Sequence, residues 1–263
     1  MNKEVNEGIK LGIKQGVVTS VSLMANMPSF EDAVQFLKNY PHVSIGLHFN
    51  ITEGKPLSKH ADGLVGKNND FYFWTQLINK LILKQVKIET VEKELAAQFN
   101  KLKASGLAIT HIDSHHHIHL YPSLFRTVSK FANKKKIVFV RGKNFNIWNL
   151  TLRNHHMPVP TQIVVNILLF INSLVNKGLE CHSESNFYDI NWGKRLTPKK
   201  LIEVLDELPE GITLLICHLA VEKERNKNSF LALRYKALEL LANPLVKKYL
   251  TRKNTSLSSY RYD

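Results

Sequence analysis

The residues best suited to chemistry lie between His111 and His119. Five of the twelve histidines of the chain fall in these nine positions, together with Asp113. Imidazole is largely neutral near pH 7 and is a common metal ligand, and a neighbouring carboxylate can orient the ring and fix its tautomer. The segment therefore favours a divalent metal site, although a histidine-rich run can also be a solvated loop that binds metals adventitiously.

The backbone conformation of this cluster decides which side chains meet. In an extended segment His111, Asp113 and His115 share one face. In a helix, His115 would instead pair with His119. Pro122 favours the extended reading, because proline is preferred at the first helical position and helical periodicity follows it. We therefore expect the next helix to begin after the histidines.

Two further histidines fall near the ends of predicted strands. His48 lies near the carboxyl end of one strand, and Gly46, on the same face, is expected to leave space beside its imidazole. His218 ends the most clearly buried strand. A lone histidine on a strand is usually structural, but enzymes with alternating strands and helices gather catalytic groups at strand carboxyl ends. Because His48, His115 and His218 all follow this pattern, we predict that they share one active site.

The elements that position these residues alternate regularly. Strands are predicted at residues 17–24, 43–51, the start of the histidine cluster, 137–141 and 211–218, with a final one at 256–260. Helices are predicted at residues 3–15, 28–37, 74–84, 88–104, 122–133, an apolar stretch ending at 177, 197–209 and 229–250. This alternation predicts an α/β fold with parallel strands, either a barrel or an open sheet.

Three segments interrupt the alternation. Residues 52–73 form a polar loop of the kind that shapes substrate clefts. Residues 142–160 are predicted to be irregular and include His155 and His156, to which no role is assigned. The aromatic segment 186–193 is consistent with a sugar site and equally with simple packing.

Composition indicates one globular domain over residues 1–263. The chain is 44% hydrophobic and 22% charged, with no shift that marks a boundary. Cys181 and Cys217 lie far apart, which argues for a reducing compartment and against a disulfide scaffold. The first residues lack the apolar region of a signal peptide. These features predict a cytoplasmic protein.

Charge and hydropathy exclude two classes of partner. The net charge is +14, which can attract anionic molecules, but the basic residues are spread along the chain, so nucleic-acid binding is not expected. The most hydrophobic run, residues 163–171, contains Asn166 and is shorter than the ~20 residues that span a bilayer. We expect no stable membrane insertion and interpret this run as a buried or interface helix, compatible with a homodimer.

Five motifs together resemble one family. They are Val5-Asn-Glu-Gly-Ile9, Gly16-Val-Val-Thr-Ser20, Gly46-Leu-His48, His111-Ile-Asp-Ser-His-His-His-Ile-His119 and Cys217-His218. The combination resembles the YdjC-like carbohydrate deacetylases, which include chitooligosaccharide deacetylases and hopanoid-biosynthesis-associated members. The resemblance runs nearly end to end, through Arg234 and Ser259-Tyr260, and the His-x-Asp-Ser-His-His-His element is quite specific.

The resemblance implies a fold, a cofactor and a substrate. The fold is a (β/α) barrel of the polysaccharide-deacetylase type, and the cofactor is a divalent metal, zinc or magnesium, held by one aspartate and two histidines. His48 and His115 match those histidines. His218 matches a late histidine and is the expected general acid, while Asp113 is expected to orient a histidine. The implied substrate is an N-acetylated carbohydrate or glycolipid, and the implied reaction is removal of the acetyl group.

The chain departs from the family pattern in two ways. Leu219 and Ala237 stand where proline and glutamate are usual. The family also begins with a strand ending in Ala-Asp-Asp-Phe-Gly, which supplies a metal ligand and the base, and nothing in the printed chain matches it. We therefore expect a barrel without its first strand, weak metal binding and little turnover. Two hypotheses explain the missing strand. In the first, Met1 is an internal methionine of a longer protein, and the DNA upstream of its codon would show whether Asp-Asp-Phe-Gly is encoded there. In the second, the protein is a degenerate paralogue that binds glycans without cleaving them. The roles of His116, His117, His119 and Arg141 are left open.

Overall fold

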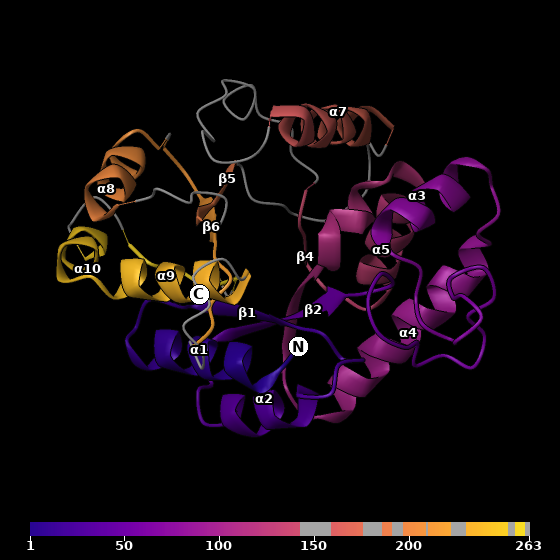
Figure 1. The fold of residues 1–263 in the computed structure, drawn as a ribbon, viewed down its shortest axis with the longest axis horizontal. Coiled ribbons are helices and arrows are strands. Elements are labelled where there is room, and N and C mark those ends of the chain that lie inside the picture. Colours follow the sequence, from indigo (N-terminus) through magenta and orange to yellow (C-terminus); the bar gives the residue numbers. More distant parts are fainter. Residues whose placement is uncertain are drawn as a thin grey trace.

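Parallel strands form the centre of the molecule, and helices surround them (Figure 1). The computed structural model describes residues 1–142, 159–175, 186–190, 197–208, 210–221, 230–251 and 256–260. One sheet contains, in spatial order, β1 (Ser20–Leu23), β2 (Ser44–Phe49), β3 (Ile109–Ser114) and β4 (Phe139–Val140). A second sheet pairs β5 (Asn186–Asp189) with β6 (Thr213–Ile216). Every strand pair in both sheets is parallel, which confirms the predicted α/β class.

The strand register places the predicted site residues side by side. In the β2–β3 pair, His48 lies opposite Asp113, and Gly46 lies opposite His111. Strand β2 is buried along nearly its whole length, as expected for a parallel strand covered on both faces. The carboxyl ends of β2 and β3 therefore present their polar side chains at the same level.

Nine α-helices are described around the sheets. They are α1 (Lys3–Lys14), α2 (Phe30–Leu37), α3 (Trp74–Ile82), α4 (Ile88–Ala104), α5 (Pro122–Lys134), α7 (Val159–Val175), α8 (Pro198–Asp206), α9 (Phe230–Ala242) and α10 (Pro244–Leu250). Local sequence signals fix several of their ends. Asn2 caps α1 by accepting a hydrogen bond from the Val5 amide at 3.0 Å, and Pro122 occupies the first turn of α5.

The histidine cluster differs from the extended segment that we predicted. Strand β3 ends at Ser114, and a short 3₁₀ helix, η1 (His115–Leu120), follows it directly. Within this helix His116 and His117 have left-handed backbone angles, with φ of 51° and 53°. The extended reading is therefore confirmed for His111 and Asp113, which lie in β3, but it is wrong from His115 onward, where the 3₁₀ helix begins. The start of α5 at Pro122 is confirmed.

Other sequence predictions need smaller corrections. The helix predicted at 229–250 is divided in two, because Pro244 cannot continue α9 and Asn243 caps α10. Residues 256–260 form no strand. The first residues of the predicted aromatic turn form β5. Residues 143–158, which include His155 and His156, lie outside the described part of the chain, as do residues 191–193.

Helix α7 faces the protein with a side that carries two asparagines and one leucine. Asn166 and Asn172 are buried, and the Asn172 amide donates to the Leu120 carbonyl at 3.0 Å. Leu169 is also buried, whereas five other large apolar side chains lie on the outer face and are about half exposed: Ile163, Val164, Ile167, Phe170 and Leu174. Neither α7 nor any other helix in the described ranges has the length and apolar character needed to cross a membrane.

Candidate active site

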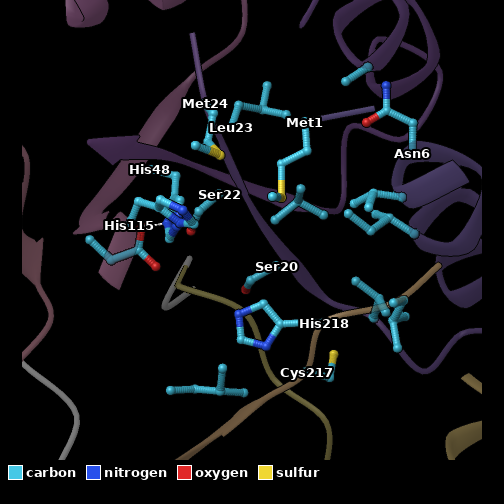
Figure 2. A pocket seen from close by; sticks show the side chains of 18 of the residues that line it. Met1, Asn6, Ser20, Ser22, Leu23, Met24, His48, His115, Cys217 and His218 are labelled. Carbon is cyan, nitrogen blue, oxygen red and sulfur yellow. Dashed lines mark hydrogen bonds and ion pairs between the residues drawn. The ribbon is translucent and has the colours of Figure 1, made fainter. Parts of the chain in front are cut away.

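A cavity of about 1070 Å³ collects the predicted site residues. Strands β1 and β6 both contribute to its lining, and so do α1 and the carboxyl end of β3. His48, Asp113, His115 and His218 all line it, as Figure 2 shows for the three histidines. The three histidines that come from distant parts of the sequence therefore meet in one cavity, as predicted.

A buried chain of three side chains fixes the His48 ring. His48 Nδ1 lies 2.7 Å from Asp113 Oδ1, and Arg141 Nη1 lies 3.1 Å from Asp113 Oδ2. Burial alone would raise the pKa of Asp113, but the His48 ring and the Arg141 guanidinium hold that pKa well below its usual range. The ionised carboxylate accepts the Nδ1 proton of His48, so in the neutral form of the ring Nε2 carries the lone pair. The contact agrees with the orienting role that we predicted for Asp113.

The second predicted metal ligand, His115, has a carboxylate partner that the sequence did not reveal. His115 Nε2 lies 2.9 Å from Glu53 Oε2, and the centroids of the His48 and His115 rings are 5.6 Å apart. The hydrogen bond from His115 outweighs burial and lowers the pKa of Glu53. Burial lowers the pKa of His115, so its ring is neutral near pH 7. Two carboxylate–histidine pairs thus stand beside each other in the cavity.

Two asparagines hold Glu53 in place. Asn50, at the end of β2, accepts the Glu53 backbone amide at 3.1 Å and donates to the Glu53 carbonyl at 2.7 Å. Asn26 donates to the same carbonyl at 3.1 Å. An asparagine that directly follows a strand commonly forms such side-chain turns. The position of Asn50 directly after a predicted strand indicates a turn there, but it does not indicate that Glu53 meets His115.

His111 has a packing role rather than a place among the metal ligands. Its Nε2 lies 3.0 Å from Ser22 Oγ, and its ring stacks on Tyr260 with 4.1 Å between the ring centres. A Cβ added to Gly46 would lie 2.2 Å from His111 Nε2. The space at Gly46 therefore accommodates the His111 ring, which corrects our expectation that it lies beside His48.

Arg141 links two further histidines of the cluster to the site. Its Nη2 lies 3.1 Å from His117 Nδ1, and its carbonyl oxygen lies 2.8 Å from His119 Nε2. His119 Nδ1 also contacts the Ser114 hydroxyl. Burial lowers the pKa of His119 to about 4, and it lowers that of His117 as well. Both rings are therefore neutral supports for the end of β3 and for Arg141.

His218 follows β6 by two residues and depends on α1 for its position. The backbone of Ala220 lies so close to α1 that a Cβ on Gly8 would be 2.4 Å from the Ala220 Cα. The Val221 amide donates to the Glu4 carbonyl at 3.0 Å. Burial, reinforced by the positive charge of Arg234, lowers the pKa of His218 to about 3, so its imidazole is neutral at pH 7.

The described side chains fit only part of a metal site. The rings of His48 and His115, the two predicted ligands, are adjacent, and burial keeps the His115 ring neutral, as metal ligation requires. A catalytic zinc usually has three protein ligands. In the described ranges, however, no three side chains of the His, Cys, Asp or Glu types are grouped so as to hold a metal ion. Among the described residues, His48 and His115 are therefore an adjacent pair of imidazoles rather than part of a set of three.

Three known proteins that are similar to this chain share one name, and two of them match it over nearly its whole length. A carbohydrate deacetylase from Clostridium beijerinckii is 29% identical over 264 residues, covering 99% of this chain and 95% of the relative. A carbohydrate deacetylase from Geobacillus stearothermophilus is 29% identical over 263 residues, covering 99% and 92%. A third, from Brevibacillus brevis, is 37% identical over 136 residues, covering 52% of this chain and 53% of the relative.

The fold and the family follow from two further comparisons. A crystal structure from Enterococcus faecalis, described as a cellobiose-phosphate cleavage protein, superposes with a TM-score of 0.78 at 22% identity, covering 98% of this chain and 93% of that one. At this identity the likeness establishes the fold. The model of the family described as YdjC-like protein matches residues 1–252. With nearly the whole chain matched, the protein belongs to the YdjC-like family.

Proposed function

We propose that this protein is a carbohydrate deacetylase that hydrolyses the N-acetyl group of an amino-sugar-containing carbohydrate or glycolipid. Two relatives named carbohydrate deacetylase align with 99% of the chain. The observation that carries the proposal is the pairing of His48 with Asp113 and of His115 with Glu53 in the cavity that also contains His218. Such groups can position an amide, activate water and move protons.

Glu53 is the carboxylate best placed to act on water. Both oxygens of Asp113 are engaged, one by His48 and the other by Arg141. Glu53 is the other acidic residue that lines the described cavity, and its side chain is 43% exposed. We assign Glu53 the removal of a proton from water as the water oxygen bonds to the acetyl carbon. Asp113 keeps His48 in a single tautomer beside this reaction.

His218 is assigned the delivery of a proton to the leaving amine. The carbon–nitrogen bond breaks with its electron pair on nitrogen, which then needs one proton to leave as an amine. We assign this proton to the one that Glu53 took from water, which passes through the His218 ring to the nitrogen, so no net proton is required. Because burial keeps the His218 ring neutral at pH 7, the ring can accept this proton and pass it on. The products are acetate and a free amino sugar.

A divalent metal, zinc or magnesium, belongs to this proposal with His48 and His115 as its side-chain ligands. Two imidazoles are fewer than the three protein ligands of most catalytic zinc sites. We therefore expect the printed chain to bind metal weakly and to turn over slowly. Isothermal titration calorimetry with zinc and with magnesium checks this expectation. The His115→Ala protein should lose the remaining metal binding. The His42→Ala protein is the control for non-specific binding of metal to histidine.

The second candidate function is a glycan-binding protein that does not cleave its ligand. The incomplete set of metal-ligating side chains in the described part of the chain favours it. Acetate release separates the two candidates. The chain is incubated with N-acetylglucosamine and its β-1,4-linked trimer, with zinc or magnesium added. A deacetylase releases acetate more slowly after His48→Ala or His115→Ala. A chain that binds the trimer but releases no acetate with either metal is the binder.

A further inference from the structure

Two aromatic side chains are exposed beside the cavity, at the start of α3. The Phe73 and Trp74 side chains are 54% and 38% exposed, and their ring centroids are 5.8 Å apart. Phe170 on α7 is another exposed phenylalanine, the third exposed phenylalanine or tryptophan among residues whose side-chain exposure the structure describes. Large apolar groups gain free energy on burial, at roughly 25 cal/mol per Å². An adjacent pair left in water marks a surface suited to a ligand.

His116 connects this pair with the cavity. Its ring centroid is 5.9 Å from that of Phe73, 6.5 Å from that of Trp74 and 3.9 Å from that of His115. His116 also lines the cavity itself. The three rings of Phe73, Trp74 and His116, called here the aromatic subsite, therefore continue from the catalytic histidines to the molecular surface.

The backbone under the aromatic subsite is held in place. The Phe73 amide donates to Gln76 Oε1 at 3.2 Å, and Leu77, one helical turn after Phe73, is fully buried. The preceding loop is tied down where buried Glu94 accepts the amides of Leu57 and Ser58 at 2.8 to 3.1 Å. The two exposed rings thus project from a fixed support, and ordering them on a ligand costs little.

His116 adopts a backbone conformation that histidine rarely takes. Its φ of 51° is left-handed, and such a residue costs about 1 kcal/mol or more unless its surroundings stabilise it. A hydrogen bond of 3.0 Å between Thr52 Oγ1 and His116 Nδ1 fixes the ring. The hydrogen bond uses one ring nitrogen and leaves Nε2 for a ligand. Strain of this kind collects at functional sites.

We propose that the aromatic subsite binds a second pyranose ring of a saccharide substrate, next to the ring whose acetamide enters the cavity. A pyranose presents an apolar face of C–H groups that packs on aromatic rings, while its hydroxyl groups can hydrogen-bond to an imidazole nitrogen. Lone amino sugars would not reach this subsite. The proposal rests on the proposed carbohydrate substrate, and it makes an oligosaccharide rather than a monosaccharide the preferred ligand.

Binding measurements on substituted proteins test the subsite. The probes are N-acetylglucosamine, its β-1,4-linked trimer and cellotriose, which has the same pyranose faces without acetyl groups. Phe73→Leu and Trp74→Leu are compared with Phe170→Leu, an exposed aromatic on α7. Calorimetry should give about tenfold weaker binding of both trisaccharides for each subsite variant, equal to about 1.4 kcal/mol. The monosaccharide should change less than twofold, and the Phe170→Leu protein should match the wild type.

The possible outcomes distinguish failure of the proposed aromatic subsite from failure of the proposed deacetylase activity. If acetate is released but the KM for the N-acetylated trimer is the same in the wild type and in both subsite variants, the aromatic subsite does not bind the substrate. The proposed deacetylase activity is then still supported. If trisaccharides quench wild-type but not Trp74→Leu fluorescence and no acetate forms, the subsite stands and the deacetylase is wrong. A third outcome concerns self-association. If tryptophan emission changes on dilution without sugar, and only in proteins that contain Trp74, then Phe73 and Trp74 form a contact between two copies of the chain, and the proposal is overturned.

Discussion

Asp113 holds both His48 and Arg141 in place in the site. One of its oxygens fixes the His48 tautomer and the other pairs with Arg141, whose second nitrogen reaches His117. The sequence suggested Asp113 as an orienter because it stands among histidines. It could not suggest Glu53, because the partner of His115 comes from a loop 62 residues earlier in the chain. Such a contact depends on how the loop after β2 is folded by Asn50.

Asp113→Asn tests this dependence. The amide cannot accept the His48 proton as a carboxylate does, and it leaves the Arg141 charge buried without its partner. We expect a 10- to 100-fold loss in kcat/KM, as is typical when an outer partner of a histidine ligand is removed. We also expect about 3 kcal/mol less stability in urea, as for a broken buried ion pair. Asp62→Asn, a substitution on an exposed loop residue, is the control. Unchanged kcat/KM in the Asp113 variant would contradict the role.

At the scale of elements, the contact of α1 with the segment after β6 positions His218. The sequence predicted α1 nearly to its ends, because this helix is strongly amphipathic. It predicted the existence of β6, but the strand is shorter than residues 211–218 and, apart from Ile216, only partly buried, which corrects the expectation of a clearly buried strand. It did not predict that Gly8 lets the two backbones approach, since nothing in a single sequence pairs residue 8 with residue 220. The sequence likewise did not predict η1. Its two residues with left-handed backbone angles are histidines, and this residue type does not signal that conformation as a glycine would.

Gly8→Ala tests this close approach. The added methyl group would lie 2.4 to 2.7 Å from backbone atoms of Ala220, so α1 or the segment that carries His218 must move. Overpacking of this kind typically costs 1 to 3 kcal/mol. We expect a lower thermal midpoint and a shifted His218 ring resonance in NMR spectra. Gly66→Ala is the matched control, because its added methyl group would be 3.6 Å from the nearest atom, a side-chain carbon of Tyr72. Equal behaviour of the two variants would refute the account.

At the scale of the whole molecule, the α/β class and the meeting of three histidines were predictable. Alternating strands and helices require parallel strands, and parallel strands bring their carboxyl ends together. The arrangement of the described strands as two sheets, with a cavity lined by both β1 and β6, was not predictable in this detail. It depends on which strands pair, and periodicity within each segment does not encode pairing.

Buried neutral histidines predict that the fold weakens in acid. Burial lowers the pKa of both His111 and His119 to about 4, against 6.5 for an ordinary histidine. Below pH 6.5 these histidines bind protons in the unfolded chain but stay neutral in the folded protein. The free energy of unfolding therefore decreases as the pH falls from 6.5 towards 4. Each ring contributes on the order of 3 kcal/mol over that interval. Urea midpoints at pH 7.5 and 5 measure the effect, and His111→Gln should reduce the difference. Equal midpoints would contradict it.

The central claim is that the carboxylate and imidazole pairs in the cavity hydrolyse an N-acetyl amide. Proton NMR can follow acetate and free amine together in one sample containing the N-acetylglucosamine trimer and zinc. We predict slow, equimolar release of both products by the wild-type protein and a rate lower by at least about 100-fold for Glu53→Gln. The exposed Glu89→Gln should match the wild type. Equal rates for Glu53→Gln and wild type, or no acetate from either protein, would contradict the account.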